Sequence, residues 1–267
     1  MGLYKEGIQA AKEASEISER LGDVVEQAHA LIKLSWALYY DGQLDEAEGA
    51  ASRAIDLLSG RDERFLLCEC HRLLGRIYRS KKDAEKSIRH FETALGIASS
   101  FNGLNLLFCI HFDLTKLFFN QARFDDANSH IQHTKLCGVN SHHSYSLACA
   151  IEMQAWVWYR QRRLEEAKTE ALCAFDAFEK LGVVKGVERV RGLLRQIDDE
   201  IQADGTSDKQ DDSGGLLETV SVADVFIDSS GYRVRMMTST LPSSSRAPSF
   251  YGPVSEVLPL YPVSSRL

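Results

Sequence analysis

The stretch Leu74-Gly75-Arg76-Ile77-Tyr78 decides the fold of this chain, because its pattern of large and small residues recurs every forty residues. Moved by that spacing, the pattern reads Leu34-Ser35-x-x-Leu38, Leu114-Thr115-x-x-Phe118 and, in the last copy, Gln154-Ala155-x-x-Trp158. Self-similarity at a fixed period of this length is the signature of a repeat protein. The sequence therefore predicts a scaffold of stacked units, in which each unit contacts only its neighbours.

Three positions of each repeat hold only small residues. With Ala28 as position 1, positions 8, 20 and 27 read Ser35, Gly75, Thr115 and Ala155; Ala47, Ser87, Ala127 and Ala167; and Ala54, Ala94, Thr134 and Ala174. Helices approach most closely where no bulky side chain separates their backbones. Positions 4, 7, 8 and 11 share one helical face, as do 20, 24, 27 and 28, so each repeat is predicted to be two amphipathic helices.

The break between these two helices is expected near position 15 of each repeat. Gly42 marks it in the first copy. Acidic pairs then open the second helix, where carboxylates favour the free amides and the positive end of the helix dipole. These pairs are Asp45-Glu46, Asp125-Asp126 and Glu165-Glu166.

The motif Leu74-Gly75-x-x-Tyr78, together with the alanines from Ala47 to Ala54, resembles the tetratricopeptide repeat (TPR) family over about residues 28 to 181. The resemblance implies an all-α fold, an α-solenoid of antiparallel helix pairs wound into a right-handed superhelix. Units of that family are usually about 34 residues long, so this chain resembles a longer variant. The runs Phe124-Asp125-Asp126-Ala127 and Phe178-Glu179-Lys180-Leu181-Gly182 are most similar to the C-terminal repeat arrays of fungal NB-ARC or NACHT signalling ATPases.

The repeat register divides the chain into four parts. Residues 1–22 are predicted to be the second helix of a half-unit, with Gly7, Ala11 and Ala14 at positions 20, 24 and 27, which suggests a truncated or divergent relative of a larger protein. Residues 23–183 hold the four repeats, and 184–203 are expected to form a capping helix. Residues 204–267 contain all five prolines and several serine runs, so this tail is predicted to be disordered, apart from a marginal hairpin at 220–236.

Composition excludes several classes of function. The net charge of −7 argues against a nucleic-acid partner, because proteins that bind phosphate backbones usually carry a basic footprint. The amino terminus is too polar for a secretory signal, and no apolar run approaches the length of about 18 residues that spans a membrane. The six cysteines fall inside predicted helices, which is typical of thiols in a reducing compartment. We expect a cytoplasmic protein without a membrane partner, and the nucleus remains open.

No motif for catalysis or for a cofactor is present. The chain has no phosphate-binding loop, no dinucleotide-binding glycine pattern, no nucleophile elbow and no zinc helix, so we expect a protein that is not an enzyme. The best metal candidate is Cys68-x-Cys70-His71 with His90. Adjacent helix positions point in different directions, so buried core cysteines are the favoured interpretation, and a thiol or metal sensor is kept as an alternative.

Histidines recur in register. His71 and His111 share position 4, and His90 and His130 share position 23, which indicates common ancestry or a packing slot more than a ligand cluster. A second group crowds one stretch around an expected helix end and is predicted to be solvated: His130, His133, His142 and His143.

Function in this architecture is expected on the inner face, which first-helix positions 2, 5, 9, 12 and 13 mainly line. Aromatic and basic residues interleave there, and these types dominate binding energy at interfaces. The residues predicted to bind a partner are Trp36, Tyr39, Tyr40, Arg72, Arg76, Arg79, Lys116, Phe119, Trp156, Tyr159 and Arg160. The prediction is a scaffold that holds an extended protein or peptide segment with acidic and aromatic residues. The alternative is that Trp36, Phe119 and Trp156 only fill space between long helices.

Two narrower functions follow from the family resemblance. The carboxylate clamp that holds chaperone C-termini in some members needs Lys, Asn and Arg at places that here hold Ile32, Trp36, Leu73, Cys109 and Asp113, so such docking is not expected. A sensor or regulatory fragment of a signalling ATPase is the main alternative, and it predicts a nucleotide-binding domain upstream in the full gene.

Overall fold

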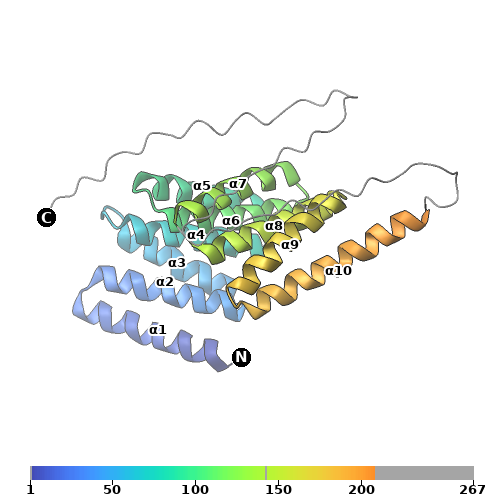
Figure 1. The fold of residues 1–267 in the computed structure, drawn as a ribbon. Helices are drawn as coiled ribbons and strands as arrows, with labels where there is room; N and C mark the ends of the chain where they lie inside the picture. The colour runs from blue at the N-terminus through green and yellow to red at the C-terminus, as the bar shows by residue number, and fades with distance from the viewer. Residues whose placement is uncertain (1, 142, 208–267) are drawn as a thin grey trace. The chain divides into compact units, whose positions relative to one another are not determined.

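The structure is a computed structural model that describes residues 2–141 and 143–207, and all of the regular structure in this part of the chain is helical. The helices are α1 (Gly2–Leu21), α2 (Val24–Asp41), α3 (Leu44–Leu58), α4 (Arg64–Ser80), α5 (Ala84–Ser100), α6 (Leu104–Asn120), α7 (Phe124–Asn140), α8 (Ser144–Arg160), α9 (Leu164–Lys180) and α10 (Val184–Ser207) (Figure 1). The predicted tail beyond Ser207 and the hairpin at 220–236 lie outside the described residues.

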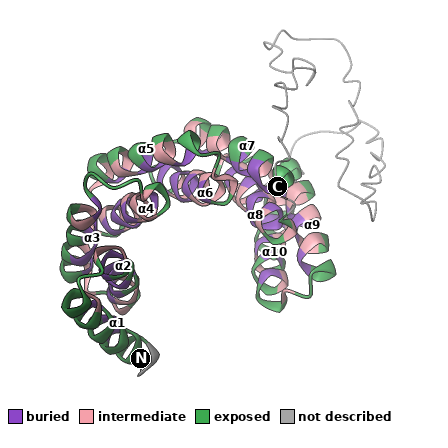
Figure 2. Ribbon diagram, turned by 90° about the vertical axis from the view of Figure 1, so that its left-hand side faces the viewer, coloured by how far each residue is buried: buried purple, intermediate pink, exposed green. Residues whose placement is uncertain are grey.

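Consecutive helices pack as antiparallel neighbours. The closest partners are α1 with α2, α2 with α3, α4 with α5, α6 with α7 and α8 with α9, and contacts between successive repeats are lighter. The even-numbered helices α2 to α10 lie on the inner side of this curved row, and the odd-numbered helices lie on the outer side (Figure 2). This arrangement confirms the predicted all-α solenoid of helix pairs.

The turn inside each repeat uses one left-handed residue at position 15. The φ angles are 86° at Gly42, 63° at Lys82, 57° at Ala122 and 62° at Arg162. Glycine adopts the left-handed region readily, so the sequence marks the turn at Gly42. At the other three positions a side chain costs about 1–2 kcal/mol in that region, and the residue type gives no sign of the turn. In the other repeats, only the forty-residue register predicts the turn.

The small residues at positions 8, 20 and 27 are buried in all four repeats, and all of them except Gly75, which has no side chain, have an exposed fraction of 0%. Some also join the two helices of a repeat directly, since the Ser35 hydroxyl donates to the carbonyl oxygen of Ala47 at 2.6 Å. Gly75 shows why bulk is excluded, because a Cβ there would lie 2.6 Å from the ring of Phe91. The packing reason given for these positions is therefore confirmed.

The two terminal helices differ from the sequence prediction in detail. In α1 the buried residues are Ile8, Ala11 and Ser15, whereas Gly7 and Ala14, which the sequence places at positions 20 and 27, are exposed. The physical reason is that α1 packs against α2 alone among the described helices, and a one-sided contact buries a single stripe.

Helix α10 covers the end of the row. It buries Val190, Leu193 and Ile197 against the last repeat, and it continues to Ser207, beyond the predicted boundary at residue 203. None of the helices in the described part of the chain is both long and apolar enough to cross a lipid bilayer.

Candidate functional site

The first half of the inner face is an interlocked set of aromatic and guanidinium groups from α2 and α4. The guanidinium of Arg76 lies 4.8 Å from the ring centre of Trp36 and 5.2 Å from that of Tyr39. Arg72 lies 5.1 Å from the Trp36 ring on the same helix face. These are cation–π contacts, so the side chains predicted to meet a partner here already contact one another.

Asp113 of α6 completes this set, and the prediction from sequence missed it. Its side chain is 5% exposed, and its carboxylate lies 3.4 Å from Arg72 Nη1, 3.8 Å from Arg76 Nε and 3.6 Å from Arg79 Nη1. Arg79 Nη1 also donates to the Asp113 backbone carbonyl at 3.2 Å. We call Trp36, Tyr39, Tyr40, Arg72, Arg76, Arg79 and Asp113 the arginine cluster. Asp113 sits at position 6, which shares a helical stripe with positions 2, 9 and 13, and that stripe was the available signal.

The arginine cluster remains charged although it is largely buried. Burial alone would lower the pKa of Arg72, but the carboxylates of Glu69 and Asp113 outweigh it and raise that pKa. Asp113 raises the pKa of Arg76 against the same effect of burial. The Nε atoms of Arg72 and Arg76 are buried without an aligned acceptor, although Arg72 Nε lies 3.3 Å from Glu69 as an ion pair. The positive charges of the cluster are therefore balanced mainly by carboxylates of the same chain.

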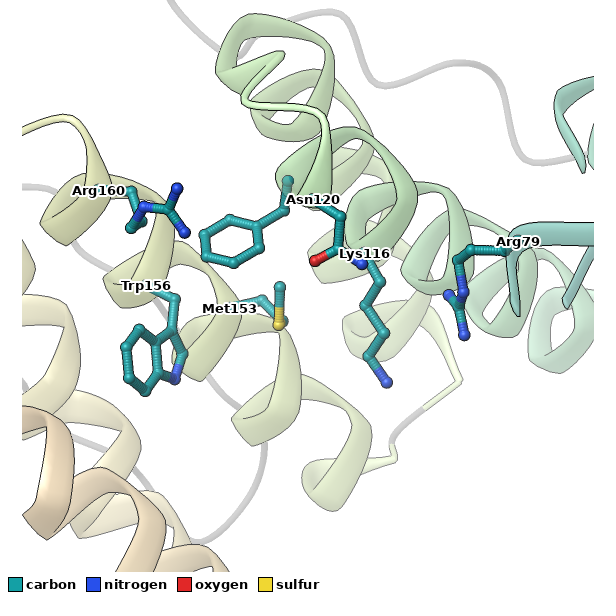
Figure 3. Close-up of a pocket in the computed structure, with 7 residues that line it drawn as sticks. Arg79, Lys116, Asn120, Met153, Trp156 and Arg160 are labelled. Atoms are coloured by element: carbon teal, nitrogen blue, oxygen red, sulfur yellow. The ribbon is translucent and has the colours of Figure 1, made fainter. Parts of the chain in front are cut away.

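The second half of the inner face contains an open pocket of about 440 Å³ between α4, α6 and α8. Figure 3 shows Met153 lying between Arg160 and Trp156 on one side and Lys116 and Arg79 on the other. We call this site the Lys116 pocket, and its lining residues are Arg79, Lys116, Phe119, Asn120, Met153, Trp156 and Arg160. Five of these residues were among those predicted to bind a partner. Asn120, at position 13, was expected on the inner face but not singled out for binding, and Met153 was missed.

Two cations in the Lys116 pocket have no carboxylate partner among the described residues, since no ion pair of residues 2–141 and 143–207 includes Lys116 or Arg160. Both instead lie over aromatic rings. Lys116 Nζ is 4.1 Å from the ring centre of Phe112, and the Arg160 guanidinium is 5.3 Å from that of Phe119. Burial lowers the pKa of Lys116, and the more distant Asp113 only partly opposes this. An anion in the pocket would relieve that cost.

Two further predicted site residues, Tyr159 and Tyr40, contact other elements of the chain. Tyr159 donates its hydroxyl to Glu200 of α10 at 2.6 Å, so it ties the last repeat to the end helix. Tyr40 is 52% exposed and stacks on Trp36 at 5.7 Å and on Tyr4 at 6.0 Å. Trp36 and Trp156 are half-buried against the core, so they fill space between helices and also face the inner side.

The cysteine-based metal candidate is not assembled. Cys68 and Cys70 are fully buried, and burial raises the pKa of each thiol to about 12. Cys68 donates its thiol hydrogen to the Ala94 carbonyl at 3.4 Å. No group of three or more metal-ligating side chains lies together within the described ranges 2–141 and 143–207. The favoured interpretation of these cysteines as core residues agrees with this burial.

The histidines around residue 130 are placed differently from the prediction. His130 and His133 lie inside α7 and not in a loop, and His130 is only half-exposed. His143 is the N-cap of α8, where its ring accepts from the backbone amide of Ser146. His142 lies outside the described residues. The local cause is that α7 continues to Asn140, about two turns past His133.

No protein-family model matches this sequence, and no curated protein matches it either. Among solved structures, aspartyl phosphate phosphatase F from Bacillus subtilis is similar with a TM-score of 0.68 and 20% identity, over 76% of this chain and 54% of that one. This chain thus spans about half the length of that protein. BtubC (BKLC) from P. vanneervenii is similar with a TM-score of 0.58 and 14% identity, over 85% of this chain and 99% of that one.

These likenesses concern the fold. At 20% and 14% identity they show a TPR-like helical repeat, in agreement with the sequence prediction. A shared fold does not carry a shared function, because function depends on the residues of the site.

Proposed function

We propose that this chain is a non-enzymatic interaction module that binds a protein or peptide partner on its inner face, with the Lys116 pocket as the main contact. The observation that carries the proposal is that Lys116 and Arg160, beside the apolar walls of an open pocket, form no ion pair with any residue that the structure describes. Lys116 is half-buried, and a charge left there without an ion pair lowers stability, a cost that a bound anion would relieve, while the exposed Arg160 lies beside it on the same pocket.

The pocket chemistry favours a segment that carries a carboxylate beside an aromatic residue. Lys116, Arg160 and the shared Arg79 would meet the carboxylate, and Asn120 adds an amide donor. Phe119, Met153 and Trp156 offer the apolar contact for a ring. The arginine cluster is a weaker candidate, because Asp113 and Glu69 already pair with its guanidinium groups.

We extend the proposal to the absence of catalysis. The pocket lining contains no carboxylate, imidazole, thiol or hydroxyl group, so its one amine, Lys116, has no acid–base partner with which to act as a nucleophile. One structural neighbour is named a phosphatase, and we do not transfer that activity. We place the module in the cytoplasm, in line with the cysteine usage discussed above.

A direct test uses the full chain and a fluorescent random copolymer of glutamate and tyrosine as the acidic, aromatic probe. The double variant Lys116→Ala with Arg160→Ala is expected to weaken binding by about tenfold or more in fluorescence anisotropy, because contacts at interface hot spots are worth at least this much. The matched control is Arg53→Ala with Lys180→Ala on the outer helices α3 and α9, which removes the same charge from exposed positions. Equal weakening in both variants would show that net charge alone explains the binding, and it would contradict the Lys116 pocket as the binding site.

A second experiment identifies the natural partner. A photo-crosslinking amino acid at exposed Asn120, beside the pocket, is expected to capture a specific protein in cells. The same crosslinker at exposed Glu92 on the outer helix α5 should not capture it. Capture from both positions, or failure of the glutamate–tyrosine copolymer to compete, would count against binding on the inner face.

The forty-residue period and the run Phe124-Asp125-Asp126-Ala127 support one narrower proposal, in which the module is the sensor array of a signalling ATPase of the fungal NB-ARC or NACHT type. Its test is the full gene, which should then encode a nucleotide-binding domain upstream of this sequence. A complete gene without such a domain would end this proposal and leave the interaction module intact.

A further inference from the structure

Two pairs of histidines occupy the same place in two consecutive repeats. The Nδ1 atoms of His71 in α4 and His90 in α5 lie 3.1 Å apart, and those of His111 in α6 and His130 in α7 lie 2.9 Å apart. The ring centres lie 5.4 Å and 5.2 Å apart, so in each pair the two nitrogens meet head-on between the rings. One N–H···N hydrogen bond therefore joins each pair, with one Nδ1 as the donor and the other as the acceptor.

The other two repeats fill this place without imidazoles. The first repeat has Leu31 and Ala50 there, both buried, and the fourth has Ile151 and Glu170. Glu170 accepts from Lys135 at 3.2 Å. The two helices of a repeat pack closely in all four copies, so the first and fourth repeats show how this packing behaves without a histidine pair.

The hydrogen bond of each pair tolerates one added proton and not two. A first proton can bind the free Nε2 of the donor ring, which leaves the bond in place but puts a charge on a half-buried ring. A second proton has to bind the accepting Nδ1 itself. Two Nδ1–H groups then face each other, so the bond is lost and two like charges meet across it.

The groups that face the first pair compensate little for a charge on it. Glu48 of α3 favours a proton on His90, whereas Lys86 of α5 opposes it. Glu48 also accepts from the Tyr78 hydroxyl, and the Tyr78 ring stacks on His90 at 5.3 Å. Burial therefore lowers the pKa of His90, and burial together with the charge of His90 lowers the pKa of His71.

The second pair faces a third imidazole and a carboxylate. His133, one turn after His130, stacks on His111 at 4.7 Å. Asp126 favours a proton on His130, but it also pairs with Arg123 at 2.7 Å. Burial, with the like charges of His133 and His130, lowers the pKa of His111 to about 4. Burial also lowers the pKa of His130.

We propose that these pairs make the second and third repeats sensitive to acid, because they join α4 to α5 and α6 to α7 at neutral pH and release these helices on taking up protons. In the opened state a histidine has an ordinary pKa of about 6.5, so below that pH the opened state binds more protons than the closed one. The stability that the pairs contribute is therefore complete above about pH 6.5. It is lost as the pH falls toward the lowered pKa values, which for His111 is about 4.

The test uses the full chain and measures hydrogen exchange of each helix between about pH 7.5 and pH 5, with rates corrected for the intrinsic effect of pH. Carboxylates with ordinary pKa values stay ionised over this range, so the histidines dominate the change. Each proton taken up on opening makes the opening equilibrium about tenfold larger per pH unit. Protection of α5 and α7 should fall by about tenfold or more. The matched second helices α3 and α9, which contain no histidine, should lose less than about threefold.

Variants separate the two pairs. His71→Leu with His90→Ala, and His111→Leu with His130→Ala, copy the first repeat at this place. Each should remove the acid effect from its own repeat and keep it in the other. The third-repeat variant should raise Tm at about pH 5 by more, because a third imidazole adds to the repulsion there. The control is His29→Ala in α2, which alters an exposed histidine and should keep both effects.

The variant His90→Gln with His130→Gln provides a test that does not depend on repacking the pairs with apolar side chains. A glutamine amide can donate to a neutral partner ring, and after it turns over it can accept from a protonated one. This variant should unfold at nearly the same temperature at about pH 7.5 and lose most of the acid effect. Equal loss of protection in α3, α5, α7 and α9 would overturn the proposal. So would a glutamine variant whose Tm falls with pH as steeply as that of the unaltered chain.

Discussion

The two halves of the inner face have the same kind of composition and different chemistry. In the arginine cluster, three guanidinium groups converge on the buried Asp113, and those of Arg72 and Arg76 lie against Trp36. In the Lys116 pocket, cations and aromatic rings gather again, but Lys116 and Arg160 have no ion-pair partner among the described residues. One buried carboxylate thus distinguishes a region whose charges pair within the fold from the region proposed to bind a partner.

Removing that carboxylate should have the largest effect. Asp113→Asn leaves Arg72, Arg76 and Arg79 facing one another, and breaking a buried ion pair in this way costs about 3 kcal/mol of the free energy of unfolding. Urea unfolding followed by circular dichroism measures the loss. The control, Asp56→Asn, alters an exposed carboxylate of α3 and should stay within about 0.5 kcal/mol of the unaltered chain. A similar small change for Asp113→Asn would contradict the role given to the cluster.

The two tryptophans should separate the halves next. Trp36→Ala is expected to lower the free energy of unfolding by about 2 kcal/mol, because it removes packing and two cation–π contacts, while binding of the glutamate–tyrosine copolymer is unchanged. Trp156→Ala should instead weaken that binding by about tenfold, because it removes a wall of the pocket. Loss of binding in Trp36→Ala with none in Trp156→Ala would reverse the assignment of the two halves.

Tyr159 should behave as part of the scaffold although it was predicted to bind. Tyr159→Phe deletes the hydrogen bond to Glu200 and is expected to cost about 1 kcal/mol of stability. Copolymer affinity should stay the same in anisotropy measurements. Tyr40→Phe is the matched control, since the Tyr40 ring is exposed and its stacking does not use the hydroxyl. A drop in affinity for Tyr159→Phe would return this residue to the binding surface.

The smallest expected effect concerns two turns, each of which follows a helix in one half of the inner face. Ala122 follows the pocket helix α6 with a left-handed φ of 57°, and Gly42 follows α2 with a φ of 86°. Ala122→Gly should raise the free energy of unfolding by about 0.5 kcal/mol, because the relief of strain exceeds the added freedom of the unfolded chain. Gly42→Ala should lower it by about 1 kcal/mol. Thermal unfolding resolves both, and the same sign for the two changes would contradict the strain argument.

Much of the fold could be predicted because the signals are local. Small residues such as Ala47 and Gly75 repeat at a fixed spacing, and helix packing turns that spacing directly into close contact. The turn at Ala122 could be predicted only from the register, since nothing in its own side chain favours a left-handed angle. The exposure of Ala14 in α1 could not be predicted from its repeat position, because it has no second helix to pack against among those described.

The candidate site was only partly predictable. Position in the repeat was enough to place Lys116, Trp156 and Arg160 on the inner face. It was not enough to show that Arg72 and Arg76 pair with Asp113, because side chains about forty residues apart choose among several partners. Tyr159 was assigned to the groove for the same reason, and its partner Glu200 lies in another helix.

The sequence by itself determined that this chain is a row of helix pairs, because a forty-residue period of small and large residues admits close packing in only one register. Only the tertiary structure decided which charges of the inner face are satisfied, and it placed two histidine pairs nitrogen to nitrogen. The physical reason is that backbone packing follows from neighbours along the chain, whereas the pairing of charged and polar groups depends on distances across it.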